Sequence, residues 1–530
     1  MLKLLPFYGI LKSIKIERRT LMFTKIHTVS LTGLDGELIE IQTDISNGMV
    51  AFDIIGLPDA TVKESRERAK ASIKNCGCEY PKKRITMNLA PASLKKEGSG
   101  FDLAITLSIL DASKQIDICD REETVFLGEL ALDGAVKPIR GILPMVISAY
   151  ERGIRKCFVP FDNADEAAII DGIEIYPVKT LNDVIDHYDG INPILPAKTD
   201  LSALSTITAV SLCDMRDVKG QEQAKRAIEV GASGLHNILM SGPAGTGKSM
   251  IAQRVGTILP DMTFEEMLEV TKLHSIAGTL PERTPLITAR PFRSPHHTVS
   301  ANALSGGGAI PRPGELSLAH HGVLFLDELP EFRRDTLEVM RQPLEDGTIT
   351  ISRVNATLTY PCNIMLIAAM NPCPCGNRNN PNRVCTCTPA QVHRYRSKIS
   401  APLLDRIDIQ IEVPAVEYDD LSKIADGDTS AQIKERVNKA RAIQLERYKN
   451  DNITANSQLT ASMLDKYCAL GEAESKLLKS AFDRLGLSAR AHGKILRVAR
   501  TIADLDKSDD IKTTHIAEAI QYRNFDRIGY

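Results

Sequence analysis

The amino-acid sequence predicts an α/β protein in which a parallel sheet with crossover helices lies between an amino-terminal α/β region and an all-helical carboxyl-terminal region. Short strand-like runs alternate with helical runs from residue 22 to about residue 189. From residue 218 to residue 413 the pattern becomes strand, glycine-rich turn and helix, which is typical of a parallel sheet. After residue 418 the spacing of apolar residues is helical.

The amino-terminal region opens with strand, turn and strand over residues 23–45, with Gly33 in the turn. The elements expected after it are a helix at 62–75, a strand at 85–89, a helix at 101–110, a strand at 124–127 and a helix at 143–152. Residues 1–21 precede a second methionine, Met22, and no small-residue cleavage site follows them. We therefore interpret them as a frayed extension or an upstream start and not as a targeting signal.

Domain boundaries follow from changes in this pattern. Prolines and small polar residues without helical periodicity indicate a linker after residue 189. We expect an extension at 1–21, an α/β domain at 22–189, a linker at 190–217, a parallel-sheet domain at 218–414, a helical connection at 415–458 and a helical domain at 459–530.

Composition excludes several classes of protein. The 530 residues are 43% hydrophobic and 25% charged, as in folded globular chains and not in disordered ones. The formal net charge of -2 excludes a globally basic nucleic-acid coat, so any polyanion site must be local. No apolar run approaches the roughly 18 residues of a membrane span, and 11 cysteines are too sparse for a secreted disulfide scaffold. We expect a cytoplasmic protein with no membrane partner.

The strongest motif is a loop of the form G-x-x-x-x-G-K-[ST] between an expected strand, 237–240, and an expected helix, 250–258. Its glycines let backbone N–H groups surround phosphate oxygens, and the helix amino terminus adds positive charge. Lys248 is expected to reach the β- and γ-phosphates of ATP, and Ser249 to bind Mg²⁺. The predicted nucleotide-binding residues are Gly242, Pro243, Ala244, Gly245, Thr246, Gly247, Lys248 and Ser249.

An apolar strand that ends in acids supplies the second half of a phosphate-hydrolysing site. Residues 322–326 lead into Asp327, which is expected to hold Mg²⁺, and Glu328, which is expected to polarise the attacking water. A further expected strand, 363–370, runs into Asn371, whose amide is a candidate for positioning that water. Acids and asparagines also occur in plain turns, so these assignments depend on the glycine-rich loop.

Two arginines complete the candidate catalytic set. Arg406 lies beside Asp405 at the start of an expected strand, and Arg490 lies near the amino end of an expected helix. A cation at a helix amino terminus opposes the helix dipole, so Arg490 indicates an anionic partner such as a phosphate.

Taken in this order, the loop, the paired acids, Asn371, Arg406 and Arg490 resemble the motifs of AAA+ ATPases. Residues 290–297 (Arg-Pro-Phe-Arg-Ser-Pro-His-His) and 371–376 (Asn-Pro-Cys-Pro-Cys-Gly) narrow the resemblance to the magnesium-chelatase-like branch and its ComM/YifB family. The resemblance implies a hexameric ring ATPase with a P-loop AAA+ core and a helical lid. It also implies that Arg406 reaches a neighbour's nucleotide and that residues 217–221 lie near the adenine.

The amino-terminal domain carries a second resemblance. Residues 128–134 and 137–143 resemble the proteolytic domain of Lon, in which a Ser–Lys dyad hydrolyses peptides. The expected nucleophile position falls on Gly100, with Ser99 one place early, and the expected lysine falls on Leu143. We therefore expect a Lon-like α/β fold that is not an active protease and has a structural or substrate-guiding role.

Two stretches of the sheet domain contain no acid, although the chain as a whole is slightly acidic. Residues 283–314 carry four arginines, and residues 371–404 carry four arginines and one lysine. Such segregation of charge favours local binding to a DNA backbone, with ordinary solvated loops as the alternative. The glycines at 306–308 suit a mobile insertion.

The second acid-free stretch also contains a cluster of cysteines. Four thiolates with proline and glycine between them are candidate ligands of a structural Zn²⁺, and a loop of reduced thiols is the alternative. The C-x-C spacing is less typical of zinc sites than C-x₂-C, and His393 is a candidate substitute ligand. The cysteines are Cys373, Cys375, Cys385 and Cys387.

The leading interpretation is an ATP-driven DNA motor of the ComM kind. Such a motor is a branch-migration helicase that acts on branched or single-stranded DNA in recombination and natural transformation. The alternatives are an ATPase subunit of a magnesium chelatase and an AAA+ ATPase that remodels proteins. The motor and the chelatase subunit share the nucleotide-site residues, whereas the Lon-like domain and the acid-free cysteine segment favour the motor.

Overall fold

A computed structural model describes residues 22–199, 213–281, 284–308, 311–353, 356–378, 380, 383–415 and 427–523. The expected extension, 1–21, and residues 200–212 of the expected linker lie outside these ranges. The first of two compact units holds the described residues up to Thr199 apart from the turn Thr32–Leu34, and the second holds those from residue 213 onward. No described helix is both long and apolar enough to span a membrane.

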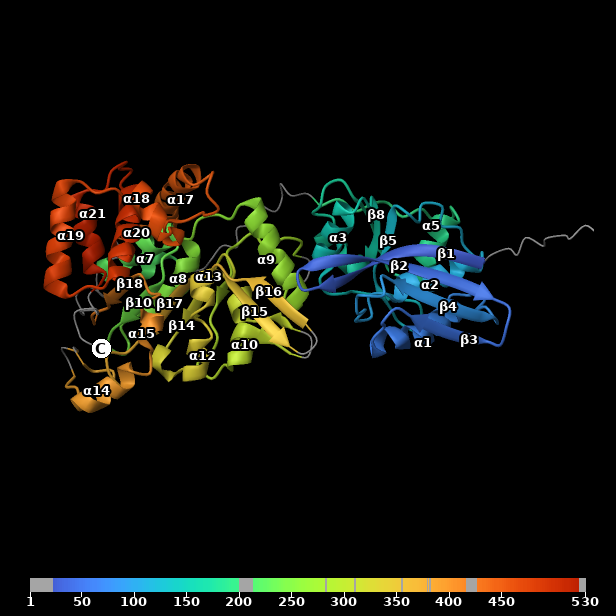
Figure 1. The fold of residues 1–530 in the computed structure, drawn as a ribbon, viewed down its shortest axis with the longest axis horizontal. Coiled ribbons are helices and arrows are strands. Elements are labelled where there is room, and N and C mark those ends of the chain that lie inside the picture. The colour runs from blue at the N-terminus through green and yellow to red at the C-terminus, as the bar shows by residue number, and fades with distance from the viewer. Residues whose placement is uncertain are drawn as a thin grey trace, which may run out of the picture. The chain divides into compact units, whose positions relative to one another are not determined.

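The first unit is built on a seven-stranded sheet with the order β3-β4-β2-β1-β5-β8-β9 (Figure 1). β2 pairs with β4 in antiparallel fashion, whereas β1, β5, β8 and β9 run parallel. The strands of this sheet are β1 Met22–Thr32, β2 Asp35–Ser46, β3 Ala51–Ile55, β4 Arg84–Ala90, β5 Thr124–Phe126, β8 Lys156–Pro160 and β9 Glu174–Val178. The helices are α1 Ala60–Asn75, α2 Asp102–Ala112, α3 Ile142–Glu151, α4 Ala164–Ala167 and α5 Leu181–Tyr188.

The expected elements of the first unit are confirmed to within a few residues. α2 is buried over its whole length because its sequence is apolar on every face. Its first residue, Asp102, has a carboxylate that accepts hydrogen bonds of 2.6 and 3.0 Å from Arg68 on α1. A buried acid needs such a partner, so this ion pair fixes the packing of α1 against α2.

The second unit contains a five-stranded parallel sheet with the order β11-β14-β17-β10-β18. Its strands are β10 Ile238–Ser241, β11 Phe292–Arg293, β14 Val323–Leu326, β17 Met365–Met370 and β18 Ile409–Glu412. Two antiparallel hairpins accompany the sheet: β12 Gly306–Gly307 with β13 Arg312–Pro313, and β15 Thr348–Arg353 with β16 Ala356–Pro361. The predicted parallel sheet is therefore confirmed, and β11 is an additional strand.

Both faces of this sheet are covered, because alternate residues of each strand enter different hydrophobic clusters. Ile238 and Met240 belong to one cluster, and Leu239 between them belongs to the other. The second cluster includes Leu273 of α9 Phe264–Ala277. This double burial explains why the strands are continuous apolar runs.

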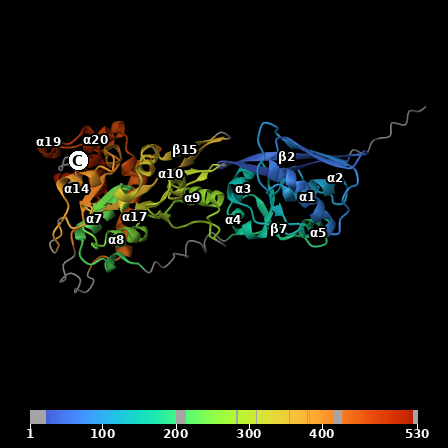
Figure 2. The same cartoon turned by 90° about the horizontal axis from the view of Figure 1, so that it is seen from below.

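The first cluster is shared between the sheet and the helices that follow it. Ile495, Val498 and Ile502 of α20 are buried in the same cluster as Ile238. α17 and α20 pack against α7 Glu222–Gly234. Figure 2 shows α7 and α17 side by side. The carboxyl-terminal helices are α17 Ser430–Arg447, α18 Ala461–Tyr467, α19 Glu472–Leu485, α20 Ala489–Leu505 and α21 Thr513–Gln521.

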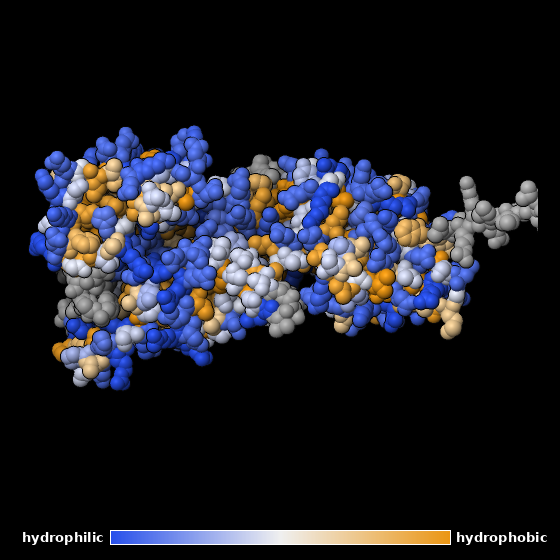
Figure 3. All heavy atoms as spheres, in the orientation of Figure 1, coloured by the Kyte–Doolittle hydropathy of each residue, from blue (hydrophilic) through white to orange (hydrophobic). Residues whose placement is uncertain are grey.

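This sharing makes the sheet and the predicted helical lid one compact unit. The boundaries expected near residues 414 and 459 stay predictions. On the face drawn in Figure 3, hydrophobic residues appear as scattered patches among hydrophilic ones, because most apolar side chains are gathered in the interior clusters.

Candidate active site

The glycine-rich loop joins the carboxyl end of β10 to α8 Lys248–Arg254. Gly247 has a φ of 83°, a left-handed conformation that favours glycine, and it is the residue from which α8 begins. A Cβ at Gly242 would collide with the carbonyl oxygen of Val413, so only glycine fits where the loop passes the end of β18. The loop therefore has the strand–loop–helix geometry that presents backbone N–H groups to phosphate.

Lys248 lies at the centre of this loop. Its Nζ donates to the carbonyl oxygens of Gly242 and Pro243, both at 2.8 Å, and lies 3.4 Å from Oδ1 of Asn371. Burial lowers the pKa of Lys248, while the negative charge of Asp327 acts in the opposite direction. The predicted phosphate-binding lysine and the predicted Asn371 are thus neighbours.

The predicted magnesium ligands also lie together. Ser249 Oγ donates a 2.5 Å hydrogen bond to Oδ2 of Asp327, which directly follows β14. A hydroxyl and a carboxylate are oxygen ligands of the kind that Mg²⁺ prefers, so these residues fit the ion. Because β14 and β10 both pair with β17 in parallel, the loop, Asp327 and Asn371 share the carboxyl edge of the sheet.

The backbone of Glu328 contacts the side chain of Asp327. It has a φ of 52°, and its N–H donates to Oδ1 of Asp327 at 2.9 Å. Its carboxylate is 55% exposed and lies 3.7 Å from Nδ1 of His297. The sequence placed His297 in the acid-free stretch at 283–314 but did not predict its contact with Glu328. Its place in the motif at 290–297 was the available signal.

The predicted arginines lie at the other edge of the sheet. Asn237, just before β10, donates from Nδ2 to the carbonyl oxygen of Arg406 at 2.9 Å, and Asp408 N–H donates to the carbonyl of Asn237 at 3.0 Å. Arg490 Nη1 lies 2.7 Å from Oδ2 of Asp405. The two predicted arginines are therefore brought together at the amino end of β10.

This position separates the arginines from the glycine-rich loop of the same chain. β10 has four residues, which span about 13 Å at about 3.3 Å per residue. The Arg406 side chain is also engaged locally, with the Glu345 carboxylate and with the Pro402 carbonyl at 3.1 Å. In the described arrangement neither arginine lies at its own chain's phosphate loop.

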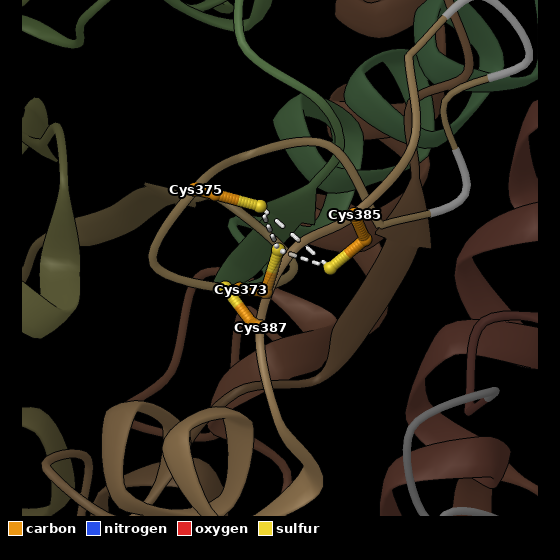
Figure 4. Close-up of side chains that lie close together, drawn as sticks. All are labelled: Cys373, Cys375, Cys385 and Cys387. Carbon is orange, nitrogen blue, oxygen red and sulfur yellow. Dashed lines mark hydrogen bonds between the residues drawn. The ribbon is translucent and has the colours of Figure 1, made fainter.

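The four predicted zinc ligands converge (Figure 4). Sγ of Cys373 lies 3.4 Å from that of Cys375 and 3.6 Å from that of Cys385, and Sγ of Cys387 lies within 4.8 Å of the other three. Four sulfurs at about 2.3 Å from a tetrahedral zinc would be about 3.8 Å apart, so the cluster fits the ion. His393 is not a member of this group.

The cysteine cluster contains one stabilised thiolate and lies against the nucleotide site. Backbone N–H groups of Asn377 and Thr386 stabilise the Cys375 thiolate and lower its pKa to about 6. A Cβ on Gly376 would lie 3.4 Å from Cβ of Ala244 in the glycine-rich loop. The loop between the cysteines therefore packs directly on the phosphate-binding loop.

A second group of potential ligands lacks the chemistry of a metal site. Nε2 of His320 and of His321 lie 3.0 and 2.9 Å from the same Glu269 oxygen. However, Nδ1 of His320 accepts a 3.0 Å hydrogen bond from Asn363 N–H, so in the neutral ring the proton is on Nε2. A metal-bound histidine shows the reverse arrangement. These histidines are donors to Glu269.

The residues at the predicted protease positions have structural contacts of their own. The Ser99 hydroxyl donates to Glu129, and Leu143 is fully buried in the hydrophobic core. The nearby Lys96 is buried, and its ammonium bonds to the carbonyl oxygens of Pro91 and Leu94.

In the structure, acids from outside the stretch 283–314 lie beside two of its arginines. Arg290 is buried and donates to Glu266 of α9 at 2.7 Å, and Arg293 makes 2.7 and 2.8 Å contacts with Glu315. The interpretation of these two arginines as a polyanion surface was wrong, because acids from outside the stretch neutralise them. Only the three-dimensional pairing reveals this.

Three family models match the chain. "Magnesium chelatase, subunit ChlI" matches residues 214–421, "Subunit ChlI of Mg-chelatase" matches residues 41–163, and "Magnesium chelatase, subunit ChlI C-terminal" matches residues 427–523. The matches cover both compact units, including the predicted Lon-like domain.

Two of the related proteins match this chain over almost its full length. The chain is 43% identical over 508 residues to the uncharacterized protein YifB of Escherichia coli, covering 95% of this chain and 97% of that protein. It is 41% identical over 507 residues to the competence protein ComM of Haemophilus influenzae, covering 95% and 98%. Lon protease 2 of Bacillus subtilis is 29% identical over 171 residues, which cover 28% of this chain and 30% of that protein. The chain therefore belongs to the ComM/YifB family of magnesium-chelatase-like AAA+ ATPases.

Proposed function

We propose that the protein is a ring-forming ATPase that moves DNA, a branch-migration motor of recombination and natural transformation that works in the cytoplasm. Support for a ring comes from the sheet, whose carboxyl edge carries the phosphate loop and whose amino edge carries Arg406 and Arg490. If these arginines serve a nucleotide, it belongs to another subunit. Such a head-to-tail contact repeats until it closes, and the family resemblance gives six as the number of subunits.

Hydrolysis in this proposal uses residues from two edges. Lys248 would hold the phosphates, Ser249 and Asp327 would hold Mg²⁺, and Glu328 would take a proton from the attacking water. A bound Mg²⁺ would neutralise charge on the phosphates. Asn371 would orient the water, while Arg406 and Arg490 would stabilise charge at the neighbour's site.

Exposed arginines without a described acidic partner are the observation that carries the DNA part of the proposal. No acid occurs between residues 347 and 404. Four arginines in this run are exposed, and no described carboxylate lies within ion-pair distance of them. These unpaired cations are Arg353, Arg378, Arg383 and Arg394. In a chain of net charge -2, these unpaired cations favour a polyanion over a protein substrate or a tetrapyrrole.

The hairpin β15–β16, whose strand β15 ends at Arg353, also presents hydroxyl groups. Thr350 and Thr359 lie side by side with their Oγ1 atoms 3.0 Å apart, and Ser352 and Thr357 repeat the arrangement at 3.0 Å. All four are exposed. Hydroxyls and guanidinium groups are common donors to DNA phosphates, and such contacts position a strand without reading its sequence.

The experiment removes two cations from different elements. In Arg353→Ala/Arg394→Ala, DNA binding should weaken equally for unrelated sequences, and the slope of log K against log salt should flatten by up to about 1.8 for duplex DNA. DNA-stimulated turnover and movement of branched junctions should fall. Arg333→Ala is the control, because Arg333 is 72% exposed but already pairs with Asp335.

The proposal fails if the wild-type protein neither binds DNA nor hydrolyses ATP faster with DNA, at low salt and with Mg²⁺. A magnesium-chelatase subunit would then be the better interpretation.

We also propose that the four clustered cysteines bind one structural zinc ion, since their spacing and the stabilised Cys375 thiolate suit it. Four protein ligands leave no open position, so the ion would order the loop and take no part in hydrolysis. The amino-terminal domain is proposed to have no peptidase activity, because Ser99 pairs with an acid and Leu143 offers no base.

A further inference from the structure

We propose that the outer edge of β3 in the first unit is a docking surface for an extended segment of a partner protein in which acidic and apolar residues alternate. β3 is the terminal strand of the seven-stranded sheet and, among the described strands, pairs with β4 alone (Figure 1). Alternate backbone groups of such a strand point away from the sheet and can pair with a further strand.

The two edges of this sheet differ in how they are covered. At the far edge, Ala197 N–H donates a 2.7 Å hydrogen bond to the carbonyl oxygen of Ile175 on β9, so the chain itself covers part of that edge. No described segment pairs with the outer side of β3. Proteins commonly protect an open edge with lysine or proline, and β3 contains neither. The edge is therefore suited to accept a strand.

Large apolar side chains are exposed along and beside this edge. Met49 and Val50 lie just before β3, Ile55 is its last residue, and Leu57 follows it. Four such side chains within nine residues form an unusual concentration for a protein surface, and concentrations of this kind mark interaction sites. An apolar partner residue would bury part of this surface.

A cavity of about 540 Å³ lies along β3 and has an excess of positive charge. Besides residues of β3, its lining includes Lys63 and Arg66 of α1 and Arg84 of β4. Arg84 pairs with the one lining acid, Asp53, at 3.0 Å. No described carboxylate lies within ion-pair distance of Lys63, and Arg66 makes only a weak surface pair with its neighbour Glu67. The cavity therefore attracts acidic groups.

The register of β3 indicates where the acidic and apolar groups of the partner would lie. In the parallel pairing with β4, Asp53 lies opposite Thr86. Ile55 comes two residues later and points to the same face of the sheet. Ile54 points to the other face and packs on the core to which α1 contributes. A strand added beside β3 would direct alternate side chains toward the cations of α1 and toward Ile55, so acidic and apolar residues should alternate along it.

The experiment uses synthetic peptides and the full chain. The probe is a short fluorescein-labelled peptide in which Glu alternates with Ile, and its binding is followed by fluorescence anisotropy at low salt. A peptide with Lys in place of Glu tests the charge, and a Glu–Ile peptide with N-methylated alternate amides tests the backbone pairing. Wild-type protein should bind the Glu–Ile peptide and should bind each of the others at least about 5-fold more weakly.

Two variants remove one feature of the surface each. Lys63→Ala/Arg66→Ala should weaken binding of the Glu–Ile peptide by about 2- to 30-fold, the range for two exposed ion pairs. Ile55→Ser removes the apolar contact and should also weaken it, and Ile55 is 52% exposed, so the change is tolerated by the fold. Lys137→Ala/Arg140→Ala is the matched control, because it removes the same residue types from exposed positions outside the cavity lining. Unchanged melting temperatures show that each variant is folded.

Failure of the wild type to bind the Glu–Ile peptide would overturn the proposal, as would equal affinity for the N-methylated peptide or wild-type affinity in folded Lys63→Ala/Arg66→Ala. If single-stranded DNA displaces the peptide and binds this variant more weakly, the surface belongs to nucleic acid, and the proposal is also overturned. The peptide measurements need neither ATP nor DNA, so they do not depend on the proposed function.

Discussion

Complementation between two inactive variants tests the division of the site between subunits. Lys248→Ala removes the phosphate-binding lysine at the carboxyl edge of the sheet, and Arg406→Ala removes the arginine at the amino edge. Each variant alone should be nearly inactive, because every site in a uniform ring lacks one group. Because β10 separates the two edges by about 13 Å, the intact halves of different subunits are expected to meet at an interface.

The size of the recovery follows from counting interfaces. In an equal mixture that assembles at random, a given site combines an intact Lys248 with an intact Arg406 of its neighbour in about one quarter of cases. Turnover per subunit should therefore reach up to about a quarter of the wild-type value. An equal mixture of wild type with the double variant Lys248→Ala/Arg406→Ala should also give about a quarter, whereas action within one chain would give about one half.

The assay is steady-state phosphate release from co-expressed subunits at known ratio, with each parent variant measured alone. Native mass spectrometry of the mixed rings checks that incorporation is random. Turnover of the mixture no higher than that of its parents, together with half activity in the wild-type and double-variant mixture, would show that Arg406 serves its own chain. That outcome would refute the inference from the sheet edges.

Two further predictions concern the nucleotide site and the metal. Glu328→Gln should bind ATP normally but hydrolyse it at least about 100-fold more slowly, whereas Lys248→Ala should bind it weakly. A fluorescent-nucleotide titration beside a turnover assay separates the two, and normal turnover in Glu328→Gln would remove its role in water activation. Fresh, reduced protein should contain about one zinc per chain by metal analysis, and Cys373→Ser/Cys385→Ser should lose it while Cys119→Ser keeps it. Zinc-free wild type would count against the site.

Local features of the fold could be predicted because each is encoded in a short segment. The strands β14 and β17 are unbroken apolar runs, as burial on both faces requires. The glycine-rich loop was recognisable because its glycines, lysine and flanking elements are adjacent in the sequence. β11 was missed because it has two residues, Phe292 and Arg293, which are too few to show a period.

Relations between distant segments could not be predicted. Arg290 seemed available for DNA because its partner, Glu266, lies 24 residues away on α9. The contact of Arg490 with Asp405 joins residues 85 positions apart, and only this contact reveals which edge of the sheet Arg490 occupies. His297 and Glu328 are likewise distant in sequence. The motifs identified the chemical groups, and the fold determines which of these groups are in contact.

The hydrophobic cluster that the sheet shares with the carboxyl-terminal helices has a consequence for truncation and evolution. A chain cut after α17 would expose apolar side chains of α7 and α17 to water, because α20 packs against both helices and Ile495, Val498 and Ile502 are buried in the shared cluster. Exposed apolar surfaces of this kind favour aggregation. We do not expect such a fragment to be a minimal ATPase. During evolution, the helices and the sheet are expected to be kept together and to change together. Substitutions in α20 that keep its apolar face should be tolerated, whereas loss of the helix should remove the whole second unit.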